Sequence, residues 1–82
     1  MLQHLYLPRQ SDSERIQEFL KDLQQLSDEE LKVREQNAKS QGIFGVHAQG
    51  LYLIALHQET KKRFHESDIV IEDNCIISFN KD

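Results

Sequence analysis

The spacing of hydrophobic positions changes from one segment of the chain to the next, and each spacing predicts a different element. Over residues 12–26, apolar side chains recur at steps of three and four, the spacing of an amphipathic helix with one apolar face. They are Ile16, Phe19, Leu20, Leu23 and Leu26. Residues 28–41 are mostly polar, and pairs such as Glu30 and Arg34 place an acid four positions before a base, which supports an exposed helix. The pattern predicts two consecutive helices, the first with a buried face and the second largely in solvent.

Capping signals mark where these two helices begin and end. Ser11 is followed three positions later by Glu14, and Ser27 by Glu30, so each pair can form a capping box. Gly42 stands where a helix would end in a left-handed residue, a conformation that glycine adopts without steric cost. The sequence therefore predicts a corner with almost no loop between the first two helices.

The third predicted helix, over about residues 45–65, contains the longest apolar run of the chain, residues 51–56. Placed at 100° per residue, one line of side chains that contains His57 runs along the whole helix. A second line on the opposite side includes Leu51 and becomes polar after Ala55. We therefore expect the first half of this helix to be buried on two sides and its second half on one. A strand over the apolar run is the alternative, because a short run does not distinguish the two.

The C-terminal segment is rich in β-branched and aromatic residues, which predicts a hairpin of two strands at about residues 68–72 and 75–79. The Asp-Asn pair at residues 73–74 suits a two-residue turn, because both residue types tolerate positive φ. In that register one face carries Val70, Ile77 and Phe79, and the other carries Ile69, Ile71 and Ile76. Both faces are apolar, so we expect one to pack on the helices and the other to be covered by the N-terminal arm or by another chain.

These elements together predict a single α+β domain that spans residues 1–82, with three helices followed by a C-terminal β-hairpin. Residues 1–10 are expected to form an N-terminal arm or an edge strand, with a short strand at about residues 2–7 that ends before Pro8. A chain of 82 residues is one domain. At this size only about 60–65% of the unfolded surface is buried, so the packing of a small core must supply most of the stability.

The charge balance narrows the classes of partner. The chain has 14 acidic residues against 10 Lys and Arg, a net charge of −4. Nucleic-acid binding is driven largely by Lys and Arg that neutralise phosphates, so nucleic acid is not expected to be the main partner. No stretch approaches the roughly 20 apolar residues of a membrane span, and the N-terminus is too polar for a signal peptide, so no membrane is expected. The single cysteine excludes an internal disulfide and predicts a cytoplasmic location.

Candidate catalytic and metal-binding groups are few. Cys75 with His57 or His65 as base is the candidate for nucleophilic catalysis, but nothing in the sequence brings thiol and imidazole together, and a strand cysteine more often packs as a small hydrophobe. The histidines of the third helix stand ten and eight positions apart, whereas a helical zinc pair stands four apart. His57 is either a hydrogen-bonded boundary residue or a contact to a partner. The sequence predicts a protein that is not an enzyme and has no metal or cofactor.

Lys61, Lys62 and Arg63 form the main basic run and are the candidate patch for nucleic acid. The alternative is a solvated helix end whose cations face the negative end of the helix dipole. Three consecutive positions span about 200° of a helix, so they do not form one face. The order of three helices and a hairpin resembles that of winged-helix proteins, in which the third helix would present polar and basic side chains to the major groove. Here the third helix is expected to be the most buried element.

The leading hypothesis is a small non-enzymatic protein-interaction or regulatory domain that self-associates through the hairpin, the third helix or both. An apolar hairpin, and a third helix with more apolar surface than the other helices can cover, support it. The candidate interface residues are His57, Tyr52, Val70, Ile77 and Phe79. A winged-helix-like nucleic-acid-binding protein that uses the basic run is the alternative, and a small enzyme that uses Cys75 with a histidine is the second alternative.

Overall fold

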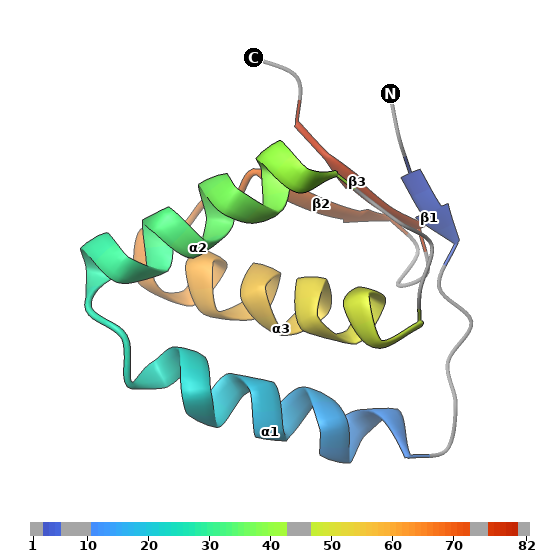
Figure 1. Cartoon of the computed structure of the whole chain (residues 1–82), viewed down its shortest axis with the longest axis horizontal. Coiled ribbons are helices and arrows are strands. Elements are labelled where there is room, and N and C mark those ends of the chain that lie inside the picture. Colours follow the sequence, from blue (N-terminus) through green and yellow to red (C-terminus); the bar gives the residue numbers. More distant parts are fainter. Residues whose placement is uncertain (1–2, 6–10, 43–46, 73–75, 81–82) are drawn as a thin grey trace.

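The computed structural model describes residues 3–5, 11–42, 47–72 and 76–80. Its elements follow the order β1 (Gln3–Leu5), α1 (Asp12–Gln24), α2 (Asp28–Gln41), α3 (His47–Phe64), β2 (Ile69–Glu72) and β3 (Ile76–Phe79). Three helices followed by a C-terminal antiparallel hairpin confirm the predicted α+β class (Figure 1). No helix formed by the described residues combines the length and the apolar character that crossing a membrane requires.

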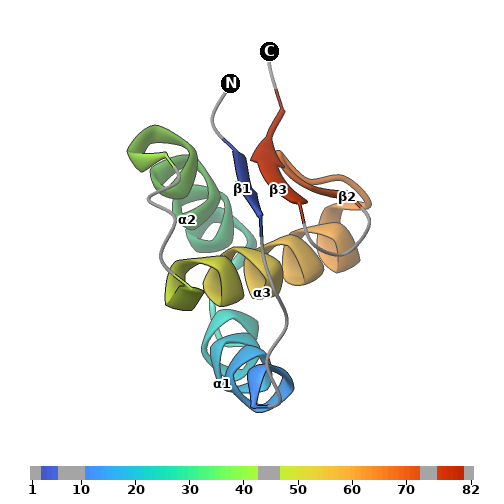
Figure 2. The ribbon, with the colours of Figure 1, turned by 90° about the vertical axis from the view of Figure 1, so that its right-hand side faces the viewer.

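The helix α3 is the central element of the molecule. It packs against α1 on one side and against α2 and the two hairpin strands on the other (Figures 1 and 2). Contact from both sides explains why the apolar run of residues 51–56 is helical, since every residue of the run except Tyr52 is buried. The alternative of a strand over this run is therefore wrong. A fully buried leucine or isoleucine contributes roughly 1.5–3 kcal/mol, so this run is the largest single contribution to the core.

The core joins all the layers around α3. Its buried apolar residues are Leu20, Leu23, Leu31, Ala38, Leu51, Leu53, Ile54, Ala55, Leu56, Ile69 and Ile77. The polar helix α2 contributes only Leu31 and Ala38 to this set, as its composition predicts. It therefore lies on the core with a narrow apolar edge and leaves both of its flanks polar.

The sheet has the strand order β1-β3-β2, with β3 antiparallel to both neighbours. The register of the hairpin differs by one residue from the prediction, because Val70 pairs with Ser78 and Ile71 pairs with Ile77. The last pair of the hairpin is Glu72 with Ile76, and residues 73–75 between them lie outside the described residues. Since side chains alternate along a strand, this slip turns every side chain of β3 to the other face. The predicted assignment of faces was therefore wrong.

The observed register places Ile69, Ile71, Ile77 and Phe79 together on the side of the helices. Ile69 and Ile77 are fully buried there, and Ile71 and Phe79 pack partly buried against the same core. Val70 and Ser78 occupy the opposite face. Burial of these four apolar side chains on one face favours this register over the predicted one, which would have divided them between two faces. The strand β1 extends the sheet at the other edge of β3, opposite Ile76 to Ser78, and does not lie across a face of the hairpin.

The helix ends test the predicted caps. The capping box of Ser27 and Glu30 is confirmed, with each backbone N–H donating to the other side chain at 2.8 and 3.2 Å. Gly42 ends α2 at φ 81°, where its N–H donates to the carbonyl of Ala38. The capping box predicted at Ser11 was wrong, because Ser11 makes no side-chain cap and its ψ of 3° is not the extended conformation that a cap requires.

Candidate functional site

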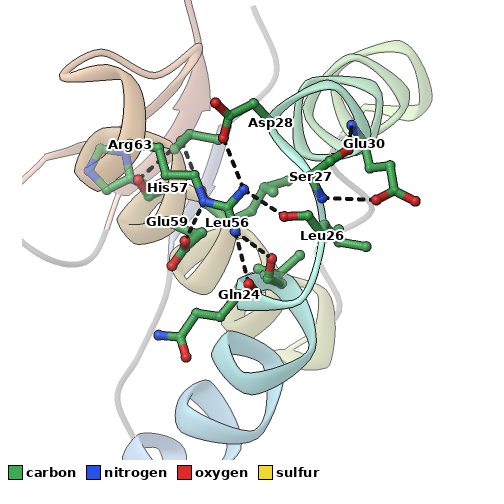
Figure 3. Close-up of polar contacts among 11 residues, drawn as sticks. Gln24, Leu26, Ser27, Asp28, Glu30, Leu56, His57, Glu59 and Arg63 are labelled. Carbon is green, nitrogen blue, oxygen red and sulfur yellow. Dashed lines mark hydrogen bonds and ion pairs between the residues drawn. The ribbon is translucent and has the colours of Figure 1, made fainter.

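Arg63, the last residue of the basic run, points into the corner where α1 ends and α2 begins (Figure 3). Its Nη1 donates to the carbonyl of Leu26 at 2.7 Å, and its Nη2 donates to the carbonyls of Leu23 at 3.1 Å and Gln24 at 3.2 Å. The last carbonyls of a helix have no partner within that helix, so a cation at this position satisfies them and faces the negative end of the dipole. Arg63 therefore caps α1 from another helix.

Two carboxylates complete the contacts of Arg63. Its Nε donates to Oε2 of Glu59 at 2.7 Å, and its Nη1 also donates to Oδ1 of Asp28 at 3.2 Å. The hydrogen bond that Arg63 donates to Glu59 raises the pKa of Arg63 above its ordinary value. All five N–H donors of the guanidinium are now engaged. We call this arrangement the Arg63 clasp.

Glu59 depends on the Arg63 clasp because its side chain is only 4% exposed. Its second oxygen, Oε1, is buried and has no hydrogen-bond partner within the part of the chain that the structure describes. A buried carboxylate is costly unless it is paired. The Arg63 guanidinium therefore serves both the end of α1 and the charge of Glu59.

The clasp separates the three residues of the basic run. Lys61 and Lys62 are exposed, whereas Arg63 turns inward with 17% of its side chain exposed. The structure does not bring the three cations to one surface. A nucleic-acid role for Lys61 and Lys62 stays a prediction, without Arg63 as a surface contact.

A polar cleft of about 360 Å³ lies between α2 and the base of the hairpin. We call it the hairpin cleft. Side chains from α2, the end of α3 and both ends of the hairpin line it, among them Lys32, Gln36, Phe64, Glu66, Asp68 and Asn80. It lies on the flank of α2 that faces the sheet.

The base of the hairpin cleft is a network of hydrogen bonds around Glu35, which is buried on α2. Its Oε2 accepts from Oγ of Ser67 and from the backbone N–H of Asp68, both at 3.1 Å. Oγ of Ser67 is also 2.8 Å from Oγ1 of Thr60 and accepts from the backbone N–H of Ile69. This network ties α2, α3 and β2 together. Because the Ser67 hydroxyl is fully engaged by these partners, the arrangement suits a structural tie better than nucleophilic catalysis.

The rim of the hairpin cleft combines an aromatic ring with charged groups. Nζ of Lys32 lies 4.9 Å from the centre of the Phe64 ring, a cation–π contact. Oδ2 of Asp68 accepts from Nε2 of Gln36 at 3.2 Å and lies 3.8 Å from Nζ of Lys39. These contacts hold Asp68 in place while a third of its side chain remains exposed.

A second hollow surface lies on the other flank of α2, between α2 and α1, and we call it the Tyr52 groove. Tyr52 on α3 is partly buried at its floor and meets the Phe19 ring edge to face, with 5.5 Å between ring centres. Two adjoining hollows of about 300 and 160 Å³ are both lined by Tyr52 and Arg34. The larger also contacts Asn37, Ala38, Gln41, Gln49 and Leu53, and the smaller contacts Phe19, Asp22, Leu23 and Leu26. The groove therefore has an apolar floor and a polar rim.

The five candidate interface residues do not meet at one surface. Tyr52 lies in the groove, and His57 lies across α3 beside β2, where its Nδ1 is 2.7 Å from the carbonyl of Ile69. A carbonyl only accepts, so this nitrogen carries the proton. Val70 is partly buried on the face of the hairpin that points away from the core. Ile77 and Phe79, expected beside Val70, lie instead on the core face, because of the shifted register.

Some polar contacts in the structure have no signal in the sequence. Asp12 is buried at the start of α1, and its Oδ1 lies 2.9 Å from Nε2 of His47 at the start of α3. Glu35 belongs to a helix whose acidic residues are all predicted from the sequence to be exposed. Cys75 and the turn at residues 73–74 lie outside the described residues, and no group of three His, Cys, Asp or Glu side chains among the described residues could hold a metal ion. The hydrogen bonds that join the elements at these places connect residues about 32 to 40 positions apart in the sequence. Local sequence patterns do not predict contacts over such separations.

Comparison with known proteins adds no relative to this picture. No protein-family model, no curated protein and no solved structure matches the chain. The functional argument therefore rests on the residues and the geometry of this chain.

Proposed function

We propose that this chain is a small non-enzymatic protein-interaction domain that forms a homodimer through the Tyr52 groove. The observation that carries the proposal is the position of Tyr52, an aromatic side chain left partly exposed between hollows of about 300 and 160 Å³. Protein interfaces are enriched in aromatic residues that sit in apolar hollows surrounded by a polar rim. The groove has this composition.

A second copy of the chain is the partner that the charges of the groove favour. Arg34 on α2 and Asp22 on α1 line the same hollow, and no ion pair joins them among the described residues. In a two-fold dimer each surface meets its own equivalent, so Arg34 of each copy can pair with Asp22 of the other. Such exposed pairs are worth only about 0.2–1 kcal/mol each, so they set the orientation of the dimer more than its affinity.

Apolar contacts would supply most of the affinity of this dimer. Tyr52 and Phe19 form the floor, and Val33 is 57% exposed one helical turn before Asn37 at the rim of the groove. Val33 is the large apolar side chain most accessible among the described residues. Burial of apolar surface is the main favourable term in association. Tyr52 and Phe19 would lie at the centre of the interface, and Val33 would lie nearer its edge.

The alternatives have less support. The register that places Ile77 and Phe79 on the core face reduces the apolar surface that the hairpin can offer for association. Two helices and the sheet surround α3, so the helix that would enter a DNA groove in a winged-helix arrangement has little free surface. Arg63, the third cation of the basic run, is engaged in the clasp.

Charge reversal tests the proposed dimer with the protein itself as the probe. We expect sedimentation equilibrium to show a monomer–dimer equilibrium for the wild type and weaker association for Arg34→Asp and for Asp22→Arg. Mixing the two variants should restore association as a heterodimer, because both pairs then carry opposite charges. Glu14→Arg and Lys21→Asp, at residues of α1 that line a separate hollow, are the matched controls and should associate as the wild type does.

Folding is checked for each variant by its thermal unfolding, so that loss of association is not mistaken for loss of structure. A wild type that stays monomeric at high concentration would contradict the proposal. So would a mixture of folded Arg34→Asp and Asp22→Arg that associates no better than either variant alone. Association that depends on Lys61 or Lys62 and on added DNA would favour the nucleic-acid alternative.

A further inference from the structure

We infer that the hairpin cleft binds the guanidinium group of an arginine side chain from a protein partner. The cleft has a volume of about 360 Å³, and its walls come from α2, from the end of α3 and from the base of the hairpin. An aromatic ring, carboxylates and side-chain amides line these walls. This inference concerns the flank of α2 opposite to the Tyr52 groove and does not depend on the dimer.

The Phe64 ring already holds a cation from the chain itself. Nζ of Lys32 lies 4.9 Å from the ring centre, within the range of a cation–π contact. Lys32 is exposed on α2 and makes no ion pair with a carboxylate among the described residues. Its contact with the ring is therefore readily exchanged. The ring face is oriented to accept a positive charge from the cleft.

The carboxylates of the cleft define the sign of the ligand. Asp68 is held by Gln36 and Lys39 and keeps a third of its side chain exposed, and Glu66 is exposed on the same rim. With the buried Glu35 at the base, three carboxylates stand against the single cation Lys32 among the lining residues. An anionic ligand would meet net repulsion, whereas a cation would be attracted.

Arginine fits this arrangement better than lysine does. A planar guanidinium can stack on the Phe64 ring while its N–H groups donate in parallel to a carboxylate such as Asp68. The amide oxygens of Gln36 and Asn80, which also line the cleft, offer further acceptors. Because the ligand must displace Lys32 from the ring, a single arginine binds weakly. It acts as one anchor of a longer segment.

The two flanks of α2 keep this site separate from the dimer. Lys32 and Gln36 line the hairpin cleft, whereas Arg34 and Gln41 line the Tyr52 groove. At 100° per residue these pairs project from opposite sides of the helix. Both surfaces can be occupied at once, and variants of one leave the other intact. Failure of one proposal would therefore not imply failure of the other.

The experiment titrates the isotope-labelled full chain with acetyl-Gly-Arg-Gly-amide and, as a neutral control of the same shape, with the citrulline peptide. We expect the side-chain amide signals of Gln36 and Asn80 to shift with the arginine peptide and not with the citrulline peptide. Lys32→Met should bind the arginine peptide about two- to fivefold more tightly, because the competing cation is gone. Lys21→Met, an exposed lysine on α1, is the matched control and should bind as the wild type does.

Replacement of the Phe64 ring tests the contact between this ring and the arginine side chain of the ligand. Phe64→Leu keeps the apolar volume and removes the aromatic face, so we expect about two- to fivefold weaker binding. Equal shifts with the arginine and citrulline peptides would overturn the inference. Weaker binding by Lys32→Met would also overturn it, and this variant changes an exposed residue whose loss leaves the fold intact.

Discussion

The two halves of α3 differ in what surrounds them. Over residues 47–55 the helix is held mainly by apolar contacts, and its partly exposed Tyr52 forms the floor of an open groove. Over residues 56–64 it carries buried polar groups, and Thr60 and Arg63 make hydrogen bonds to other elements. The first half thus supplies the core and an open surface. The second half supplies the Arg63 clasp and the contact of Thr60 with Ser67, and the first half adds the contact of His47 with Asp12.

This difference has a physical basis. Apolar burial is non-directional, so it draws α1, α2 and the sheet onto α3 without setting their angles closely. Hydrogen bonds require a defined distance and direction. The Arg63 clasp and the Glu35 network therefore define where α1 ends and where β2 begins relative to α3. Variants that remove one kind of contact at a time can separate the two contributions.

The largest effect is expected at the clasp. Arg63→Met retains an apolar stem but leaves the buried Glu59 without its partner, so we expect a loss of about 3–5 kcal/mol in the free energy of unfolding. Urea unfolding followed by circular dichroism measures it. Lys62→Met, the exposed neighbour, should change stability by less than about 0.5 kcal/mol. Equal effects of the two variants would mean that the clasp does not stabilise the fold.

The next effect belongs to the apolar half. Leu53→Ala removes a side chain that is 1% exposed beneath the Tyr52 groove, and we expect it to cost roughly 2–5 kcal/mol. Val33→Ala, at a side chain that is 57% exposed on α2, is the control and should be nearly neutral in the monomer. Thermal unfolding of both variants at low protein concentration makes the comparison. A melting temperature that Leu53→Ala leaves unchanged would place the core elsewhere.

A smaller effect is expected in the network at the base of the hairpin cleft. Thr60→Val keeps the shape of the side chain and removes its hydroxyl, which should cost about 1 kcal/mol. Thr60 and Glu35 are both hydrogen-bonded to Ser67. The change in unfolding free energy of the double variant Thr60→Val with Glu35→Gln should therefore differ from the sum of the two single changes by roughly 0.5 kcal/mol or more. Strictly additive changes in urea unfolding would argue against a connected network.

The capping box of Ser27 and Glu30 lies in the same corner as the Arg63 clasp and is a local contact with which the clasp can be compared. Ser27→Ala removes a helix cap and should cost about 1 kcal/mol, less than loss of the clasp. The Ser27 N–H lowers the pKa of Glu30 below its ordinary value of 4.5. Just below pH 4.5 the unfolded chain therefore binds more protons at Glu30 than the folded chain does. The stability that this hydrogen bond contributes is present above pH 4.5 and is lost as the pH falls through the lower pKa of the folded state. Glu30→Gln removes the titrating carboxylate at nearly the same side-chain length, so it should flatten that part of the acid unfolding profile, and an unchanged profile would contradict the assignment.

Local patterns determined the helices of this protein. The bounds of α2, the corner before it and the end at Gly42 follow from capping residues and charge spacing that act within one or two turns. The apolar run of residues 51–56 identified the centre of the core, and the aromatic residue within it, Tyr52, was a candidate from sequence for a contact surface. These features need only neighbours in the chain. A sequence is sufficient to predict them.

Only the tertiary structure decided the contacts between distant segments. The hairpin register depends on which face meets the helices, and the local sequence suits the predicted pairing of the strands as well as the observed one. From the sequence, Arg63 is predicted to be a surface cation, and only the fold places the end of α1 beside it. Glu35 is predicted to be exposed, and only the fold brings Ser67 and Asp68 to it. Such hydrogen bonds join groups more than 30 positions apart, and their worth depends on burial that arises only when the layers pack around α3.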